Sequence, residues 1–381
     1  MTSYTLDWQK YSTIARTAAA EGCVLLKNDN HALPICSGET VSVFGRIQLD
    51  YFKSGTGSGG KVNVPYVRSI IDGLALYPSV NIYEPLLNVY RDWVKENPFD
   101  NGHGWGTEPW CQVEMALSDE LVKDAADHSD LALIILGRTA GEDRDNSAQK
   151  GSYLLSPAEH DMLTKVCAAF KRTVVVLNVG NIIDMSWVEE FDPSAVLYVW
   201  QGGMEGGYGA ADILCGAVSP CGKLSDTIAK SIDDYPSTAN FGSDTANIYQ
   251  EDIYVGYRYF ETFAKDKVQY PFGFGLSYTT FDTTVEPVEY DLENTLTCTV
   301  SATVTNTGTC AGKEVIQVYI CPPQGALGKP VRNLVGFAKT KTLQPGESEA
   351  LTIAFSAETY ASYDDSGASG YKSCFVLEAG E

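Results

Sequence analysis

Basic side chains and long apolar segments are both scarce in this chain of 381 residues. Lys and Arg together number 27 against 49 Asp and Glu, which gives a formal net charge of −22. So acidic a chain is repelled by phosphate backbones and anionic lipids, and we expect neither nucleic acid nor a membrane as a partner. No apolar run approaches the length of a membrane span, and the segment up to Trp8 lacks the basic and apolar regions of a secretory signal. These absences predict a cytoplasmic protein.

Patterns for metal ions, disulfides and phosphates are also missing. The four histidines show no metal-type pairing with each other or with cysteine, and none of the ten cysteines forms a CxxC. We therefore expect reduced, mostly buried thiols, no metal and no cofactor. The glycine-rich stretch Gly55–Gly60 continues as Lys61-Val62, which departs from the Gly-Lys-Ser/Thr ending of a phosphate-binding loop.

Helical and strand patterns alternate from residue 8 to about residue 235, which predicts a mainly parallel sheet with helices on both faces. We assign residues 1–235 to such a flavodoxin-like α/β sandwich. The predicted helices are Trp8–Cys23, Val67–Leu76, Val113–Ala126, Pro157–Phe170 and Gly206–Cys215. The predicted strands are Val41–Phe44, Val80–Tyr83, Leu131–Leu136, Thr173–Leu177 and Ala195–Trp200.

The rest of the chain changes character twice. Residues 236–280 are rich in Tyr, Phe, Gly and Pro, which predicts an ordered connector. Residues 281–381 show period-two alternation with turns between strands, typical of a fibronectin type III-like β-sandwich. The last predicted strand, Tyr371–Glu378, ends almost with the chain, so we expect this sandwich to lack its last strand.

A carboxylate follows one of the predicted strands. After Leu131–Leu136 come Gly137-Arg-Thr-Ala-Gly-Glu142, then Asp143-Arg-Asp-Asn146. Ligands of open α/β sheets bind beyond the carboxyl ends of the strands, so Glu142 stands at a candidate site. The stretch resembles the catalytic acid/base segment of glycoside hydrolase family 3, the β-glucosidase family, with Glu142 at the acid/base position.

Five further segments resemble the same family in the same order. They are Ala18–Asn28 with Leu33-Pro34, Gly55–Gly59, Trp200–Gly203 with Glu205-Gly206, Pro220–Ser225 and Tyr270–Tyr278. The resemblance implies a (β/α)8 barrel that carries the nucleophile, and this chain does not contain one. It therefore implies the amino-terminal half of an enzyme with inverted domain order, whose barrel lies downstream in the same polypeptide or on a second chain. The implied substrate is a β-glucoside or cello-oligosaccharide, and homo-oligomerisation stays open.

The resemblance assigns roles to three residues. Glu142 would be the general acid and then the general base, which requires a carboxyl group that is still protonated near neutral pH. Ser58 and Arg144 would bind substrate. The residues after Glu142 differ from the Gly-Tyr-Asp-Arg common in the family, and Asp143 and Asp145 are fallback candidates for the acid.

Other interpretations remain open from the residues alone. The oxygens of Glu142, Asp143, Asp145 and Asn146 could bind calcium, although their spacing is not that of an EF-hand. The aromatic residues Tyr51, Phe52, Trp105 and Trp110 could stack on sugars, and we assign them no role.

Two functions compete with a retaining exo-β-glycosidase. One is a non-catalytic module that binds sugar or a subunit, and the other is a flavodoxin-like nucleotide-binding protein. Retention needs two carboxyl groups about 5 Å apart, so we expect this chain alone to be inactive.

Overall fold

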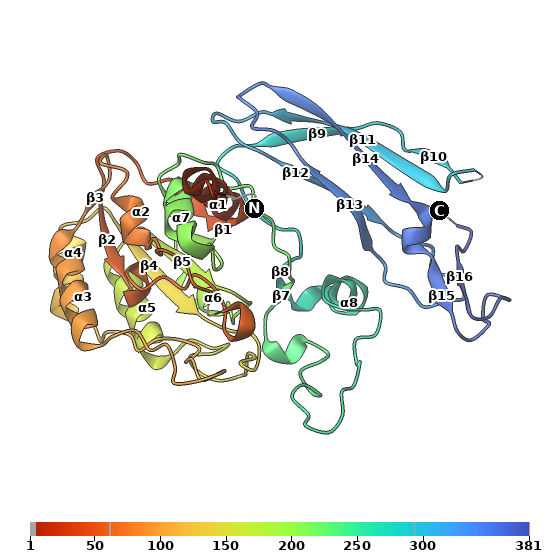
Figure 1. Ribbon diagram of the computed structural model, residues 1–381. Coiled ribbons are helices and arrows are strands. Elements are labelled where there is room, and N and C mark those ends of the chain that lie inside the picture. The colour runs from red at the N-terminus through yellow and green to blue at the C-terminus, as the bar shows by residue number, and fades with distance from the viewer. Residues whose placement is uncertain (1–4, 61, 293, 381) are drawn as a thin grey trace. The chain divides into compact units, whose positions relative to one another are not determined.

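The computed structural model describes residues 5–60, 62–292 and 294–380 (Figure 1). They form two compact units. Unit 1 runs to Lys223 and includes Gly275–Tyr278, whereas unit 2 comprises Leu224–Phe274 and the chain from Thr279 onward. The segment predicted as an ordered connector, residues 236–280, is divided between the two units, and its role as a connector stays a prediction.

Unit 1 is built on a six-stranded sheet in the order β1-β6-β5-β4-β2-β3. Its strands are β1 (Val24–Asn28), β2 (Thr40–Phe44), β3 (Asn81–Ile82), β4 (Leu131–Arg138), β5 (Thr173–Val179) and β6 (Ala195–Tyr198). Only the edge strand β1 runs antiparallel to its neighbour. Every residue of β4 and β5 is buried, as expected for apolar strands covered on both faces. The predicted mainly parallel α/β fold is confirmed.

Helices cover both faces of this sheet (Figure 1). Helices α1, α2 and α7 pack together on one face, and α4, α5 and α6 pack together on the other. Gly207 of α7 allows the close approach to α2, since a Cβ there would lie 2.2 Å from the Ser69 carbonyl oxygen. The helices of unit 1 are α1 (Trp8–Gly22), α2 (Ile70–Leu74), α3 (Glu84–Glu96), α4 (Asp119–Asp127), α5 (Pro157–Ala169), α6 (Trp187–Phe191) and α7 (Gly206–Leu214).

Two predicted helices are wrong in extent. The helix predicted over Val113–Ala126 begins only after Ser118, whose side chain caps α4 by accepting from the Leu121 N–H. The helix predicted over Val67–Leu76 shrinks to α2, because Ser69 forms a capping box there. In both cases a serine inside the apolar pattern starts the helix, and the residues before it lie outside regular secondary structure.

The strands of the second part of unit 2 pair antiparallel, which confirms the all-β character predicted for this part. Strands β10, β11 and β14 form one sheet with β9, while β12 pairs with β13 and β15 with β16. Its elements are β7 (Ile228–Ala229), α8 (Tyr257–Phe263), β8 (Val268–Tyr270), β9 (Phe281–Val285), β10 (Glu289–Asp291), β11 (Thr297–Asn306), β12 (Val315–Ile320), β13 (Asn333–Lys339), β14 (Ser348–Ser356), β15 (Ser362–Asp364) and β16 (Cys374–Val376). The missing last strand stays a prediction.

The described residues include every cysteine of the chain. None of the ten is in a disulfide. Three of them are buried, five are half-buried, and Cys36 and Cys321 are exposed, so fewer are fully buried than the sequence predicts. In the described ranges, no helix combines the length and apolar character needed to cross a bilayer.

Candidate active site

Strand β4 delivers Glu142 to the carboxyl edge of the unit 1 sheet. The strand extends to Arg138, and Glu142 lies exposed on the loop that follows, as predicted. A tight turn presents it, in which the Arg144 N–H donates to the Gly141 carbonyl oxygen over 2.9 Å. Asp143 within this turn has φ 60°, a left-handed conformation that aspartate tolerates better than most residues. The side chain of Glu142 therefore stands on a defined turn.

The glycine-rich loop lies directly against this turn. The Thr56 N–H donates to the Ala140 carbonyl oxygen over 3.1 Å, and Thr56 pairs with Gly141 in an isolated parallel bridge. Gly57 has φ +78°, and a Cβ at this position would lie 2.4 Å from the Glu142 Cβ. Glycine is thus required at residue 57 by conformation and by space.

Ser58 is the hydrogen-bond partner of Glu142. Its hydroxyl donates to Glu142 Oε2 over 2.6 Å, and its backbone N–H donates to the same oxygen over 3.0 Å. The Ser58 hydroxyl, followed by its backbone N–H, holds the pKa of Glu142 below its ordinary value, because both bonds favour the carboxylate. A general acid needs the opposite shift, so this geometry favours the base form of Glu142.

The loop of residues 99–110 supports the other residues around Glu142. The Trp105 indole N–H donates to the Asp143 carboxylate, and the Trp110 indole N–H donates to the Asp145 carbonyl oxygen over 3.0 Å. The guanidinium of Arg144 lies 3.9 Å from the centre of the Trp110 ring, and its Nε donates to a backbone carbonyl oxygen. The sequence alone assigns these two tryptophans no role. The presence of indole donors in an irregular loop was the available signal.

The substrate-binding roles of Ser58 and Arg144 stay predictions. The structure brings Ser58 to Glu142, whereas Arg144 packs on Trp110. Of the fallback acids, Asp143 is bonded to Trp105 and Asp145 is exposed. Tyr51 and Phe52, the other unassigned aromatics, are buried.

A buried ion pair anchors the two ends of the loop. Arg138, at the end of β4, forms a two-pronged ion pair with Glu159 of α5, and the two side chains are 1% and 6% exposed. Arg138 also donates to the carbonyl oxygens of Ser152 and Leu154, which lie at the far end of the loop. Glu159 forms the predicted capping box with Ser156 as well. One guanidinium therefore fastens both ends of the segment that carries Glu142.

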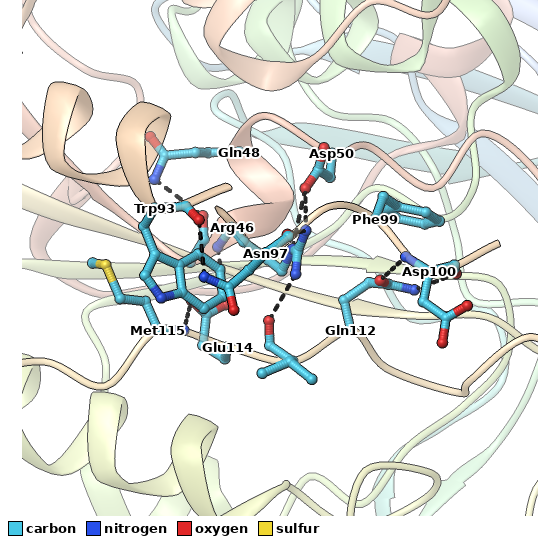
Figure 2. A network of polar contacts seen from close by, with 12 residues as sticks. Arg46, Gln48, Asp50, Trp93, Asn97, Phe99, Asp100, Gln112, Glu114 and Met115 are labelled. Carbon is cyan, nitrogen blue, oxygen red and sulfur yellow. Dashed lines mark hydrogen bonds and ion pairs between the residues drawn. The ribbon is translucent and has the colours of Figure 1, made fainter. Parts of the chain in front are cut away.

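A pocket of about 640 Å³ lies on the same edge of unit 1. The glycine-rich loop lines one side of it, and residues 99–102, 108, 109 and 112 line another. Asp50, Asp100 and Gln112 of this lining belong to the polar network drawn in Figure 2. In that network, Arg46 contacts Asp50 and the backbone of Asn97 and lies near Trp93. Glu114 accepts the Arg46 N–H over 2.9 Å, and burial raises the pKa of this carboxyl group to about 7.

In the part of the chain that the structure describes, no three His, Cys, Asp or Glu side chains gather in a way that could hold a metal ion. The acidic residues 142, 143 and 145 therefore do not form the set of oxygen ligands that the calcium interpretation requires.

Comparisons with known proteins agree with this architecture. The sequence pattern of the Glycosyl hydrolase family 3 C-terminal domain matches residues 23–278, and that of the Fibronectin type III-like domain matches residues 314–381. A β-glucosidase of Ruminococcus albus is 55% identical over 99% of this chain, which covers 39% of that protein. An exo-α-(1→6)-L-arabinopyranosidase of Bifidobacterium breve is 32% identical over 95% of this chain, which covers 46% of that protein.

A solved structure has the same sequence identity to this chain as the Ruminococcus albus protein. The crystal structure of a β-glucosidase from Paenibacillus barengoltzii matches with a TM-score of 0.96 and 55% identity. The match covers 99% of this chain and 41% of that one. This chain thus spans less than half the length of each of these three relatives.

Proposed function

Because this chain belongs to glycosyl hydrolase family 3, we propose that it is part of a retaining exo-acting β-glycosidase, with β-glucoside or cello-oligosaccharide as substrate. The 55% identity to a β-glucosidase favours this substrate class over that of the arabinopyranosidase, which is 32% identical. The observation that carries the proposal is an exposed carboxylate, Glu142, held on a defined turn at the carboxyl edge of the sheet.

In this proposal Glu142 acts twice. It first gives its proton to the glycosidic oxygen as the bond from that oxygen to the anomeric carbon breaks. A carboxylate about 5 Å away bonds to the anomeric carbon in the same step. Glu142 then accepts a proton from the water that attacks this intermediate and frees the nucleophile. We propose that the nucleophile comes from a (β/α)8 barrel, either in the same polypeptide or on a second chain.

Two further parts of the proposal concern substrate contacts and cellular location. Ser58 and Arg144, which flank the candidate acid, are proposed to contact substrate. A cytoplasmic location is also proposed, because ten cysteines outside any disulfide suit a reducing compartment.

The test is Glu142→Gln in the enzyme that contains the barrel. Substrates with poor leaving groups need a proton in the first step, so we expect their kcat/KM to fall by orders of magnitude. Activated aryl glucosides do not need that proton and should lose far less in the first step. Azide should restore part of their turnover, because it replaces base-assisted water. Full activity of Glu142→Gln on poor leaving groups would refute the assignment.

Two comparisons sharpen this test. Asp145→Asn removes the exposed fallback acid, and the dependence on leaving group should follow Glu142 rather than Asp145. The 381-residue chain alone should hydrolyse no aryl β-glucoside at a measurable rate. Hydrolysis by that chain alone would mean that the second carboxyl group lies within it, and that the barrel is not required.

A further inference from the structure

The contact between the glycine-rich loop and Glu142 is more specific than ordinary loop packing. Two donors of one residue, the Ser58 hydroxyl and the Ser58 N–H, converge on the single oxygen Oε2. Gly57 contributes the space for this approach, since any side chain there would meet the Glu142 Cβ. Donors that converge in this way stabilise negative charge at that oxygen.

From this geometry we propose that Ser58 is a positioning residue, whose two hydrogen bonds hold the Glu142 carboxylate in place and stabilise it in the ionised form that acts as the base of the second step. The proposal rests on the proposed function, because it assigns a role in the same acid/base cycle. When Glu142 is ionised, the Ser58 hydroxyl donates to it. When Glu142 carries a proton, that proton is donated to the glycosidic oxygen, and the Ser58 hydroxyl keeps its own hydrogen throughout.

Two of the other charged side chains on the loop of Glu142 have partners of their own. On its own loop, the Asp143 carboxylate accepts from Trp105, Arg144 lies on the Trp110 ring, and Asp145 is exposed. Within residues 5–60, 62–292 and 294–380, no cationic side chain forms an ion pair with Glu142. In this described part, the hydrogen bonds of Ser58 are thus the direct control on the carboxylate.

The direct experiment measures the titration of Glu142 in the 381-residue chain, by NMR of glutamate labelled with carbon-13 at the side-chain carboxyl carbon. Glu142→Gln identifies the signal. Ser58→Ala removes the hydroxyl and keeps the backbone donor, and the titration midpoint should move to higher pH. Ser58→Thr keeps a hydroxyl and should restore the midpoint of the unmodified chain.

Ser54→Ala is the matched control. The Ser54 hydroxyl donates to the Gly60 carbonyl oxygen over 2.8 Å, so this variant also removes one hydrogen bond from the glycine-rich loop without touching Glu142. Its Glu142 midpoint should not move. An unchanged midpoint in Ser58→Ala, or an equal shift in Ser54→Ala, would overturn the proposal.

A second arm uses the enzyme that contains the barrel. The acid form of Glu142 persists to higher pH when its pKa rises, so the alkaline limb of kcat/KM should move to higher pH in Ser58→Ala. An unmoved limb would count against Ser58 as a positioning residue. The two proposals fail separately: active Glu142→Gln removes the proposed function, whereas an unmoved NMR midpoint in Ser58→Ala removes only the role of Ser58.

Discussion

Glu159→Gln is the sharpest test of how the loop of Glu142 is anchored. Glutamine has nearly the same shape as glutamate, and its oxygen can still serve the capping box with Ser156. The substitution therefore removes one charge and leaves Arg138 buried without its counter-ion. Arg138 is 1% exposed, so water cannot replace the lost carboxylate.

The expected cost follows from that burial. Breaking a buried ion pair by removing one partner costs about 3–5 kcal/mol. Arg138→Met in the Glu159→Gln background removes the buried charge that has lost its partner. The double variant should therefore lose little or no further stability relative to either single variant. The exposed pair Asp92–Lys95, with side chains 78% and 73% exposed, is the matched control. Asp92→Asn should cost less than about 1 kcal/mol.

Tryptophan fluorescence during urea unfolding measures this cost in unit 1 alone. All six tryptophans lie in unit 1, and Trp187 is fully buried there. If the free energy of unfolding of Glu159→Gln lies within about 1 kcal/mol of that of the unmodified chain, the anchoring argument is refuted. So would a double variant whose loss equals the sum of the two single losses, because coupled partners cannot be additive.

Two further changes test the rest of unit 1. Glu114 has its pKa raised to about 7 by burial, above the 4.5 of an exposed glutamate. The protonated Glu114 therefore stabilises the folded state fully below about pH 4.5, and this contribution falls by about 3 kcal/mol as pH rises through 7. Urea unfolding at several pH values measures this loss, and Glu114→Gln should remove the pH dependence of the free energy of unfolding in this range. A pH dependence that persists would show that another group titrates. Ser69→Ala removes the capping box of α2 and should cost about 1 kcal/mol by the same fluorescence assay, whereas no loss would mean that packing against α7 alone holds the helix.

Local patterns predicted the parts of unit 1 that depend on neighbours in sequence. The apolar runs Leu131–Leu136 and Thr173–Leu177 are buried strands, because each is apolar on both faces. The Ser-Pro-x-Glu start of α5 forms the capping box that its spacing predicts. The position of Glu142 on the edge of the sheet followed from the end of its strand.

Long-range contacts around the site were not predictable in the same way. Ser58 and Glu142 are 84 residues apart, and no periodicity relates a glycine-rich loop to a particular turn. The helix predicted from Val113 failed for a related reason. The Gln112 side chain bonds both backbone groups of Asp100, and residues 113–118 lie outside regular secondary structure although their composition suits a helix.

The anchoring of Glu142 also bears on how one carboxyl group could act as acid and then as base. Its described partners favour the carboxylate, so the proton needed in the first step requires an opposing influence. A second carboxylate about 5 Å away would supply it, because like charges at that distance raise the pKa of one partner. Once that nucleophile is esterified by the sugar, its charge is gone and the influence of Ser58 prevails. Glu142 would then be ionised at the stage where a base is needed, and the fixed loop would require no rearrangement between the two steps.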